Sequence, residues 1–267
     1  MNPIGYLKGM LRNRAGKAAR DEILNQDEIA IDPDDFSASL RSPTDYYLRA
    51  FQDFHRLIPT ELRDHRGYFR SERRGFGEDA FHTMWWRLIR RFRPTSFLEI
   101  GVYRGQTLSL VSMLTKMEGL ACDVTGVSPF SSAGDSVSRY DVGLDYRVDT
   151  LNNFSHFGLP EPELCEAFST DEKATNLIES RRWDMIYIDG NHDLEVVKAD
   201  WEVCSRSLSE GGIIVMDDSG LSSSYRPPAF ATGGHPGPSE FVCGIDAEKF
   251  EEILQVGHNR VFQKRMA

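Results

Sequence analysis

Hydrophobic residues from position 96 onward follow two alternating patterns. Short apolar runs of strand length recur near residues 96–101, 122–127, 163–168, 184–189 and 212–217. Apolar side chains recur at helical spacing between them, near 105–117, 146–156, 171–180 and 193–208. Strands that alternate with helices are typical of an α/β protein with a parallel, doubly wound sheet. Apolar runs at 250–256 and 261–264 flank the turn Gly257-His258-Asn259, which predicts a C-terminal antiparallel hairpin.

Residues 41–94 predict a helical cap ahead of the sheet. Ser42 and Pro43 form a helix-start signal, and a second helix is predicted over 77–92. Residues 1–40 carry clustered Lys and Arg up to Arg20 and then a run of Asp and Glu. We expect a solvated arm there. The alternative is a basic helix that binds a membrane surface or a partner, followed by an acidic linker.

Composition and charge argue against several classes of protein. The 267 residues can bury a full core, and the four cysteines form no C-x-x-C pair, so we expect reduced thiols. The net charge of -10 argues against nucleic-acid binding, which depends on clustered Lys and Arg. The sequence has no run of about 18 apolar residues and no secretion leader, so we expect a cytoplasmic protein without a membrane span.

Acidic residues stand at the ends of the two most apolar predicted strands. Asp189 ends the strand near 184–189, and Asp217 and Asp218 end the strand near 212–217. His192 follows Asp189 by three residues. The carboxyl ends of parallel strands form the edge at which α/β proteins bind ligands, so these four side chains predict a functional site.

A glycine-containing turn follows the first predicted strand, in the segment E-I-G-V-Y-R-G from Glu99 to Gly105. Glycines there allow a ligand to approach the backbone closely, and the next helix offers unpaired N–H groups. The spacing is E-x-G-x-x-x-G and not the dinucleotide-binding G-x-G-x-x-G, which makes a nucleotide-dependent oxidoreductase a poorer hypothesis.

The segments E-I-G-V-Y-R-G, D-M-I-Y-I-D-G-N-H and G-G-I-I-V-M-D-D, in that order, resemble class I S-adenosylmethionine-dependent methyltransferases. The resemblance covers about residues 96–267 and is strongest to the metal-dependent O-methyltransferases, such as catechol O-methyltransferase and the macrocin-type sugar enzymes. It implies a Rossmann-like, mostly parallel sheet of seven strands in a methyltransferase domain over 95–267. The N-terminal helical extension would precede this domain.

The resemblance implies a set of cofactor contacts. Glu99 would lie near the amino-acid end of S-adenosylmethionine, with Gly101 and Gly105 beneath it. Relatives end their second strand in an acidic residue that holds the ribose, whereas this chain has Ser128 there. The adenine side would fall at Ser169 to Asp171, where Asp171 is also an ordinary helix cap. The predicted cofactor-binding residues are Glu99, Gly101, Tyr103, Gly105, Ser128, Ser169, Asp171 and Asp189.

Asp189, Asp217 and Asp218 match the metal-ligand positions of the metal-dependent group, and their oxygen donors suit Mg²⁺ or Mn²⁺. The alternative is that Asp217 and Asp218 only begin a turn. His192 matches the position of the catalytic base and would accept a hydroxyl proton. Its alternative role is to satisfy backbone groups at the start of a helix.

The predicted reaction is transfer of the sulfonium methyl group to a hydroxyl of a small molecule or glycan, with S-adenosylhomocysteine (SAH) as product. A sugar hydroxyl is preferred and a phenolic hydroxyl is the alternative. A non-catalytic scaffold that keeps the fold is the hypothesis from another class, and Ser128 is its main support. The sequence leaves assembly into a homo-oligomer open. Residues 219–239 predict a loop that is either a lid or disordered. The candidates for substrate contact are Tyr225, Arg226, Phe230, His235, Trp85, Trp86 and Tyr103.

Overall fold

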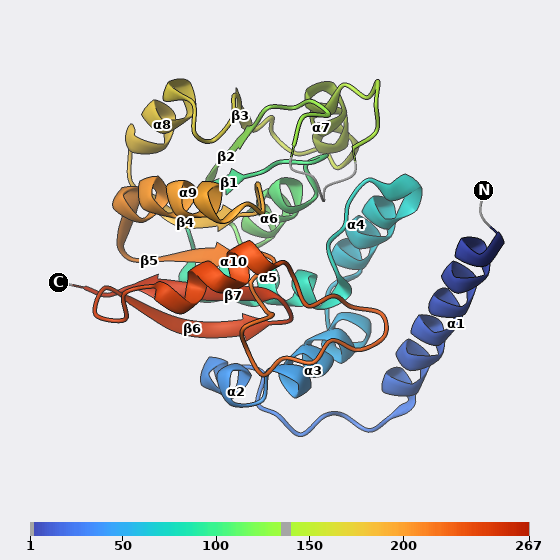
Figure 1. The fold of residues 1–267 in the computed structure, drawn as a ribbon. Helices are drawn as coiled ribbons and strands as arrows, with labels where there is room; N and C mark the ends of the chain where they lie inside the picture. The colour runs from blue at the N-terminus through green and yellow to red at the C-terminus, as the bar shows by residue number, and fades with distance from the viewer. Residues whose placement is uncertain (1–2, 135–139, 267) are drawn as a thin grey trace.

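The computed structural model describes residues 3–134 and 140–266. Its centre is a seven-stranded sheet with the order β3-β2-β1-β4-β5-β7-β6 (Figure 1). The strands are β1 (Ser96–Ile100), β2 (Asp123–Ser128), β3 (Glu163–Glu166), β4 (Trp183–Ile188), β5 (Leu208–Met216), β6 (Phe250–Val256) and β7 (Asn259–Lys264). Strands β1 to β5 pair in parallel, and β7 runs antiparallel to β5 and β6. The predicted sheet and its C-terminal hairpin are confirmed.

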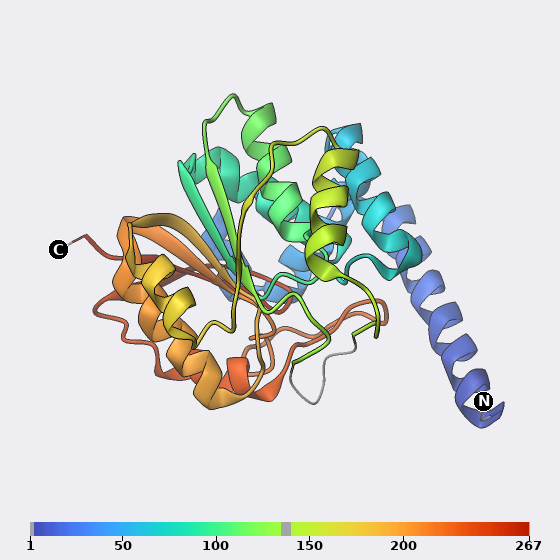
Figure 2. The same cartoon turned by 90° about the horizontal axis from the view of Figure 1, so that it is seen from above.

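Helices cover both faces of this sheet (Figures 1 and 2). On one face lie α3 (Pro43–Arg56), α5 (Asp79–Phe92), α6 (Gln106–Met117) and α7 (Tyr146–His156), and on the other α8 (Glu172–Glu179), α9 (Leu194–Ser207) and α10 (Pro236–Phe241). Successive strand residues point to opposite faces, so Phe97 packs in the first core and Leu98 in the second. Burial on both faces explains why these strands read as continuous apolar runs.

The strand order reverses between β1 and β4. The chain runs from β1 outward to β3 and then returns to place β4 on the other side of β1. Backbone hydrogen bonds hold the strand ends together here, because Asp189 N donates to Ile100 O at 2.8 Å and Asp217 N donates to Ile188 O at 3.0 Å. Such a switch point is where open α/β sheets form their ligand crevice.

The N-terminal region is more ordered than the sequence predicts. Residues 1–40 contain α1 (Pro3–Asn25) and α2 (Phe36–Arg41), and α4 (Thr60–Arg70) adds a further helix to the cap. The start of α1 extends away from the body, but its C-terminal end packs on α3 (Figures 1 and 2). Arg20 pairs with the buried carboxylate of Asp79, and Gln52 donates to Ile23 O. The second half of this segment is therefore part of the folded body and not a solvated arm.

The described parts of the chain include no helix that combines the length and the apolar character needed to cross a membrane. Two short 3-10 helices, η1 (Ser71–Arg73) and η2 (Val242–Gly244), complete the secondary structure of these residues.

Candidate active site

A cavity of about 580 Å³ lies at the carboxyl ends of β1, β2, β4 and β5. This volume is within the usual range for a small-molecule site. Most of the side chains singled out in the sequence line it: Glu99, Gly101, Tyr103, Ser128, Ser169, Asp189, His192, Asp217 and Asp218. Gly105 and Asp171 lie outside this lining. The topology thus brings together strand ends that are more than 100 residues apart in sequence.

One end of the cavity is built on the turn after β1. Glu99 is 3% exposed, and its Oε2 atom has no hydrogen-bond partner among the described residues. Burial raises the pKa of Glu99 to about 8, although a hydrogen bond from the Leu108 backbone favours the ionised form. Gly101 has a φ of 94°, and a Cβ atom there would lie 1.9 Å from Asp189 O, so only glycine fits.

The predicted ribose and adenine contacts are less complete. Ser128 lines the cavity, but its hydroxyl donates to Val102 O at 2.9 Å, which leaves it only acceptor capacity for a ligand. Ser169 also lines the cavity. Asp171 is exposed and accepts a hydrogen bond from Phe168 N at 2.9 Å, so its carboxylate closes a local turn.

Charge is concentrated at the opposite end, beside β4 and β5. Burial, and then the negative charge of Asp217, raise the pKa of Asp189 well above its usual value. His258 Nδ1 lies 3.0 Å from Asp217 Oδ1 and 3.3 Å from Asp218 Oδ1.

His258 contacts the carboxylates of Asp217 and Asp218 from the turn between β6 and β7. Burial alone would lower its pKa, but the negative charges of Asp217 and Asp218 raise it to about 9. The same contact lowers the pKa of Asp217 against the effect of burial. An imidazolium inside the protein therefore balances part of the charge of this acidic cluster.

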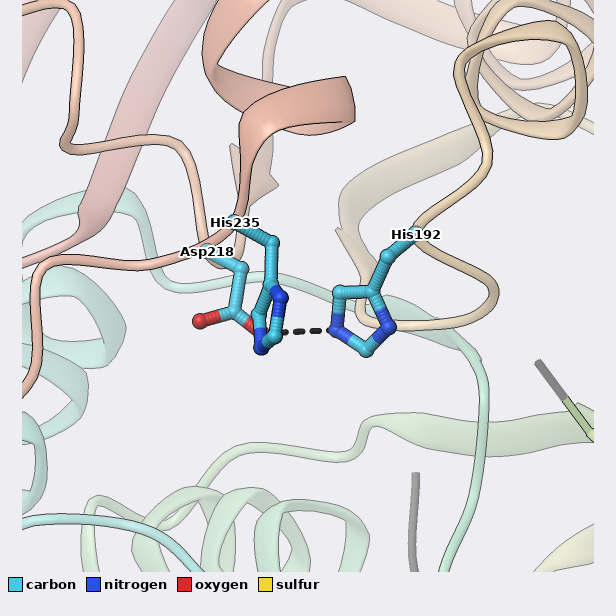
Figure 3. A group of neighbouring side chains, drawn as sticks. All are labelled: His192, Asp218 and His235. Atoms are coloured by element: carbon cyan, nitrogen blue, oxygen red, sulfur yellow. Dashed lines mark hydrogen bonds and ion pairs between the residues drawn. The ribbon is translucent and has the colours of Figure 1, made fainter. Parts of the chain in front are cut away.

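His192 lies on the loop after β4 and faces the segment after β5 (Figure 3). Its Nε2 atom is 2.8 Å from Asp218 Oδ2, and the ring of His235 is 4.1 Å from the His192 ring, centroid to centroid. Ligand atoms of His192, Asp218 and His235 all lie within 4.8 Å of one another, as do those of Asp217, Asp218 and His258. Asp189 belongs to neither group of three.

Comparisons with known proteins agree with the fold described above. Residues 98–219 match a family model described as a methyltransferase domain. An SAH-bound methyltransferase from Podospora anserina aligns over 79% of this chain and 89% of its own, with a TM-score of 0.54 at 18% identity. A putative caffeoyl-CoA O-methyltransferase from Staphylococcus aureus aligns over 80% and 96%, with a TM-score of 0.56 at 13% identity. The protein has the class I methyltransferase fold.

One further solved structure and one sequence relative are also similar to this chain. An O-methyltransferase from Bacillus cereus, solved in complex with SAH, aligns over 80% of this chain and 95% of its own, with a TM-score of 0.54 at 14% identity. An uncharacterized protein of Acanthamoeba polyphaga mimivirus is 24% identical over 157 residues. That match covers 58% of this chain and 62% of the relative, so the chain spans less than two thirds of the relative's length.

His258 and Glu78 are among the cavity residues that the sequence prediction does not include. His258, in the turn between β6 and β7, is predicted only as a turn residue, yet the pairing of Met216 with Arg260 brings it beside Asp217. Glu78 precedes α5 and accepts hydrogen bonds from Tyr47 Oη at 2.7 Å and Thr232 N at 3.1 Å. His258 could have been found from the sequence, because a C-terminal hairpin usually lies beside the fifth strand. No pattern in the sequence indicated Glu78.

The aromatic and loop candidates divide into two groups. Trp85, Tyr103 and His235 line the cavity. Tyr225 and Phe230 pack instead on the cap, with ring-centroid distances of 5.4 Å to Tyr47 and 4.7 Å to Phe51, respectively. Arg226 and Trp86 are likewise outside the cavity lining. The loop after β5 is therefore held on α3 by its aromatic side chains.

Proposed function

We propose that this protein transfers the methyl group of S-adenosylmethionine to a hydroxyl group. The observation that carries the proposal is the cavity at the switch point of a methyltransferase fold, which has a buried carboxylate at one end and a His–Asp pair at the other. The two ends suit two reactants. One is the cofactor over the turn after β1, and the other is an acceptor beside β4 and β5.

The cofactor end suits a cationic ligand. The buried, unpaired oxygen of Glu99 is a fitting partner for the α-ammonium group of S-adenosylmethionine, and Gly101 leaves room for the ligand above the backbone. An unpaired carboxylate in a buried site is costly, and a bound ammonium would relieve that cost. Ser128 would accept one hydrogen bond from the ribose, which is a weaker contact than a carboxylate provides.

The acceptor end suits proton removal. With the Nε2–H of His192 donating to Asp218, Nδ1 carries the lone pair that can take a proton. The acceptor oxygen would attack the methyl carbon as the bond between carbon and sulfur breaks, SAH would leave, and the hydroxyl proton would pass to His192. Asp218 would orient the imidazole and stabilise its charged form.

A divalent ion fits the adjacent carboxylates. The charges of Asp189 and Asp217 interact at the ends of β4 and β5, and Asp218 follows Asp217 directly, so the three could hold Mg²⁺ or Mn²⁺. The ion would supply charge that lowers the pKa of a bound hydroxyl. A sugar hydroxyl is the acceptor we favour, since its pKa is high and the reaction needs a base such as His192. A phenolic hydroxyl would need less help.

A non-catalytic scaffold is the second candidate. The hydroxyl of Ser128 is already bonded to Val102 O, and β2 ends in this serine where the relatives have a carboxylate. If this lost contact abolished cofactor binding, the fold would serve only to bind a partner.

Calorimetric titration of SAH into the purified protein, with Mg²⁺ and then with EDTA, separates the two candidates. Micromolar binding is expected from the enzyme, and labelled methyl transfer from S-adenosylmethionine to a panel of sugars and phenols would then identify the acceptor. Absence of SAH binding in both buffers would contradict the enzyme and favour the scaffold.

A further inference from the structure

His192, Asp218 and His235 form a ligand set that differs from the predicted carboxylate trio. We infer that they bind one divalent transition-metal ion of the Mn²⁺, Fe²⁺, Co²⁺ or Zn²⁺ class at the acceptor end of the cavity (Figure 3). The inference deepens the proposed function, because it concerns the same cavity, but it does not depend on methyl transfer. Only Asp218 is common to the two sets.

The distances suit coordination. Asp218 Oδ2 lies 2.8 Å from His192 Nε2 and 4.0 Å from His235 Nε2. Metal–ligand bonds of about 2.0–2.2 Å place neighbouring donor atoms roughly 3–4 Å apart, so small side-chain rotations would bring all three onto one ion. The three side chains come from the two loops that follow β4 and β5 and point toward one another (Figure 3).

The backbone holds these loops in register. His235 N donates to Asp218 O at 2.8 Å, and Ser239 Oγ donates to the same carbonyl at 3.1 Å. A Cβ atom on Gly237 would lie 2.0 Å from His192 O, so glycine is required for the His235 loop to approach the His192 loop. Main-chain contacts thus fix the backbone from which the side chains of His192, Asp218 and His235 extend.

Asp218 itself carries backbone strain. Its φ is 51°, in the left-handed region that non-glycine residues rarely adopt. Strain of this kind persists where surrounding contacts enforce it, and it is concentrated at functional sites. Here it aims the carboxylate between the two imidazoles. The second oxygen of Asp218 lies 3.3 Å from His258 Nδ1, which supplies the outer contact that usually orients a ligating carboxylate.

The chemistry of the donors selects the ion. Imidazole nitrogen suits Zn²⁺ and other first-row transition metals, whereas Mg²⁺ prefers oxygen alone. Two histidines and one carboxylate, with the remaining positions open, is a ligand set of catalytic zinc and of non-haem iron. His192, Asp218 and His235 all line the cavity, where an acceptor hydroxyl could bind. With the ion bound, His192 is a ligand and does not act as the base.

Metal titration of the full chain tests the inference. Protein stripped with EDTA and dialysed is titrated with Zn²⁺ by calorimetry, and Mg²⁺ is titrated separately. We expect one equivalent of Zn²⁺ to bind at least about 100-fold more tightly than Mg²⁺. His192→Ala and His235→Ala should each weaken Zn²⁺ binding at least about 100-fold, since even the outer contacts of metal ligands contribute 10–100-fold.

Two control variants locate the ion. His156→Ala removes an exposed histidine that stacks on Tyr68, far from the cavity lining, and should leave Zn²⁺ binding unchanged. Asp189→Asn removes a member of the carboxylate trio and should change Zn²⁺ affinity by less than about threefold. An equal loss of Zn²⁺ affinity in Asp189→Asn would overturn the inference in favour of the carboxylate trio. Unchanged Zn²⁺ affinity in His235→Ala would overturn it in favour of adventitious surface binding.

A second variant guards against a folding defect. His235→Cys supplies a thiolate at the same position, and Co²⁺ added to this variant should give a sulfur-to-metal charge-transfer band that the parent protein lacks. Absence of that band in a variant with an unchanged circular dichroism spectrum would count against the site. SAH titration of the same samples keeps the two proposals apart, because retained Zn²⁺ binding without SAH binding would reject only the methyltransferase.

Discussion

The two ends of the cavity are assembled in different ways. The end beside β1 depends on one continuous segment, in which Glu99 and Gly101 follow a buried strand within three residues of each other. The end beside β4 and β5 draws on four separate segments, which contribute Asp189 with His192, Asp217 with Asp218, His235, and His258. A local motif is visible in a sequence, whereas a site of this second kind becomes visible only through the topology.

The ends also differ in electrostatics. Burial is the main cause of the raised pKa of Glu99, and the charge of Asp217 adds a smaller effect. The carboxylates beside β5 interact mainly with one another and with His258. Glu99 and the carboxylate cluster should therefore respond differently to mutation and pH, which allows each end to be tested.

The largest expected effect is at the charged end. His192→Ala should lower kcat for methyl transfer about 10²- to 10⁴-fold, because both roles proposed for His192 act on the acceptor hydroxyl. SAH affinity should change by less than about threefold, since the proposed contact with the SAH ammonium is Glu99 and not His192. Steady-state kinetics and SAH titration measure the two quantities. A parallel loss of SAH affinity would mean that the two ends are not separate, and His156→Ala serves as the control.

The next effect concerns Glu99. Glu99→Gln should weaken SAH binding about 10- to 100-fold at pH 8, because a charged hydrogen-bond partner of the ammonium is lost. Wild-type affinity should also rise about tenfold per pH unit up to pH 8 and then level off, since only the ionised carboxylate pairs with the ammonium. Titrations from pH 6 to pH 9 test this, and a wild-type profile as flat as that of the variant would contradict it.

A smaller effect is expected in the packing beneath the cofactor end. His65 and His82 are buried 3.1 Å apart, between Nδ1 and Nε2, and His65 Nε2 contacts Ser109 Oγ at 2.9 Å. Burial lowers the pKa of His82 to about 3 and that of His65 well below 6.5. The unfolded chain therefore takes up protons first, and the folded state loses stability as pH falls below about 6.5.

Each of the two histidines should contribute about 1.4 kcal/mol per pH unit to this loss. Urea unfolding at pH 7.5 and pH 5.5 measures the difference in free energy. His82→Gln should remove the contribution of His82, about 1.4 kcal/mol per pH unit below pH 6.5, and an unchanged pH dependence would show that His82 does not contribute to acid stability.

The smallest effect is expected at Ser128. Ser128→Ala should change SAH affinity by less than about threefold, because the hydroxyl is already committed to Val102 O. Ser128→Asp should strengthen SAH binding several-fold if the ribose lies there, since a carboxylate can accept two hydrogen bonds. SAH titration measures both affinities. If Ser128→Asp binds SAH no more tightly than the wild type, the ribose lies elsewhere.

Much of the fold follows from local patterns in the sequence. The apolar runs predict β1 to β5 and the hairpin within a few residues, because strands buried on both faces must be apolar throughout. The helix α4 is missing from the prediction, since only Leu62, His65 and Phe69 are buried in its 11 residues and the rest are largely charged or polar. Helix α1 was expected as an arm because its basic residues gave no apolar stripe.

The site residues, like the fold, are only partly predictable from local sequence patterns. Glu99, Gly101, Asp189 and Asp218 could be located from strand ends, but the contacts of His258 and Glu78 depend on how distant segments pack. His235 was one of several unranked candidates in a loop without periodicity. Its place opposite His192 is fixed by hydrogen bonds to Asp218 O, which no sequence pattern records.

The position of His258 has a consequence for biosynthesis. The turn between β6 and β7 is made after every other segment of the cavity, so a ribosome-bound chain exposes Asp189, Asp217 and Asp218 before their internal cation exists. Domains generally fold as units. The acidic crevice therefore gains its internal cation only when the hairpin has emerged and docked against β5, which makes completion of the site one of the last events of folding.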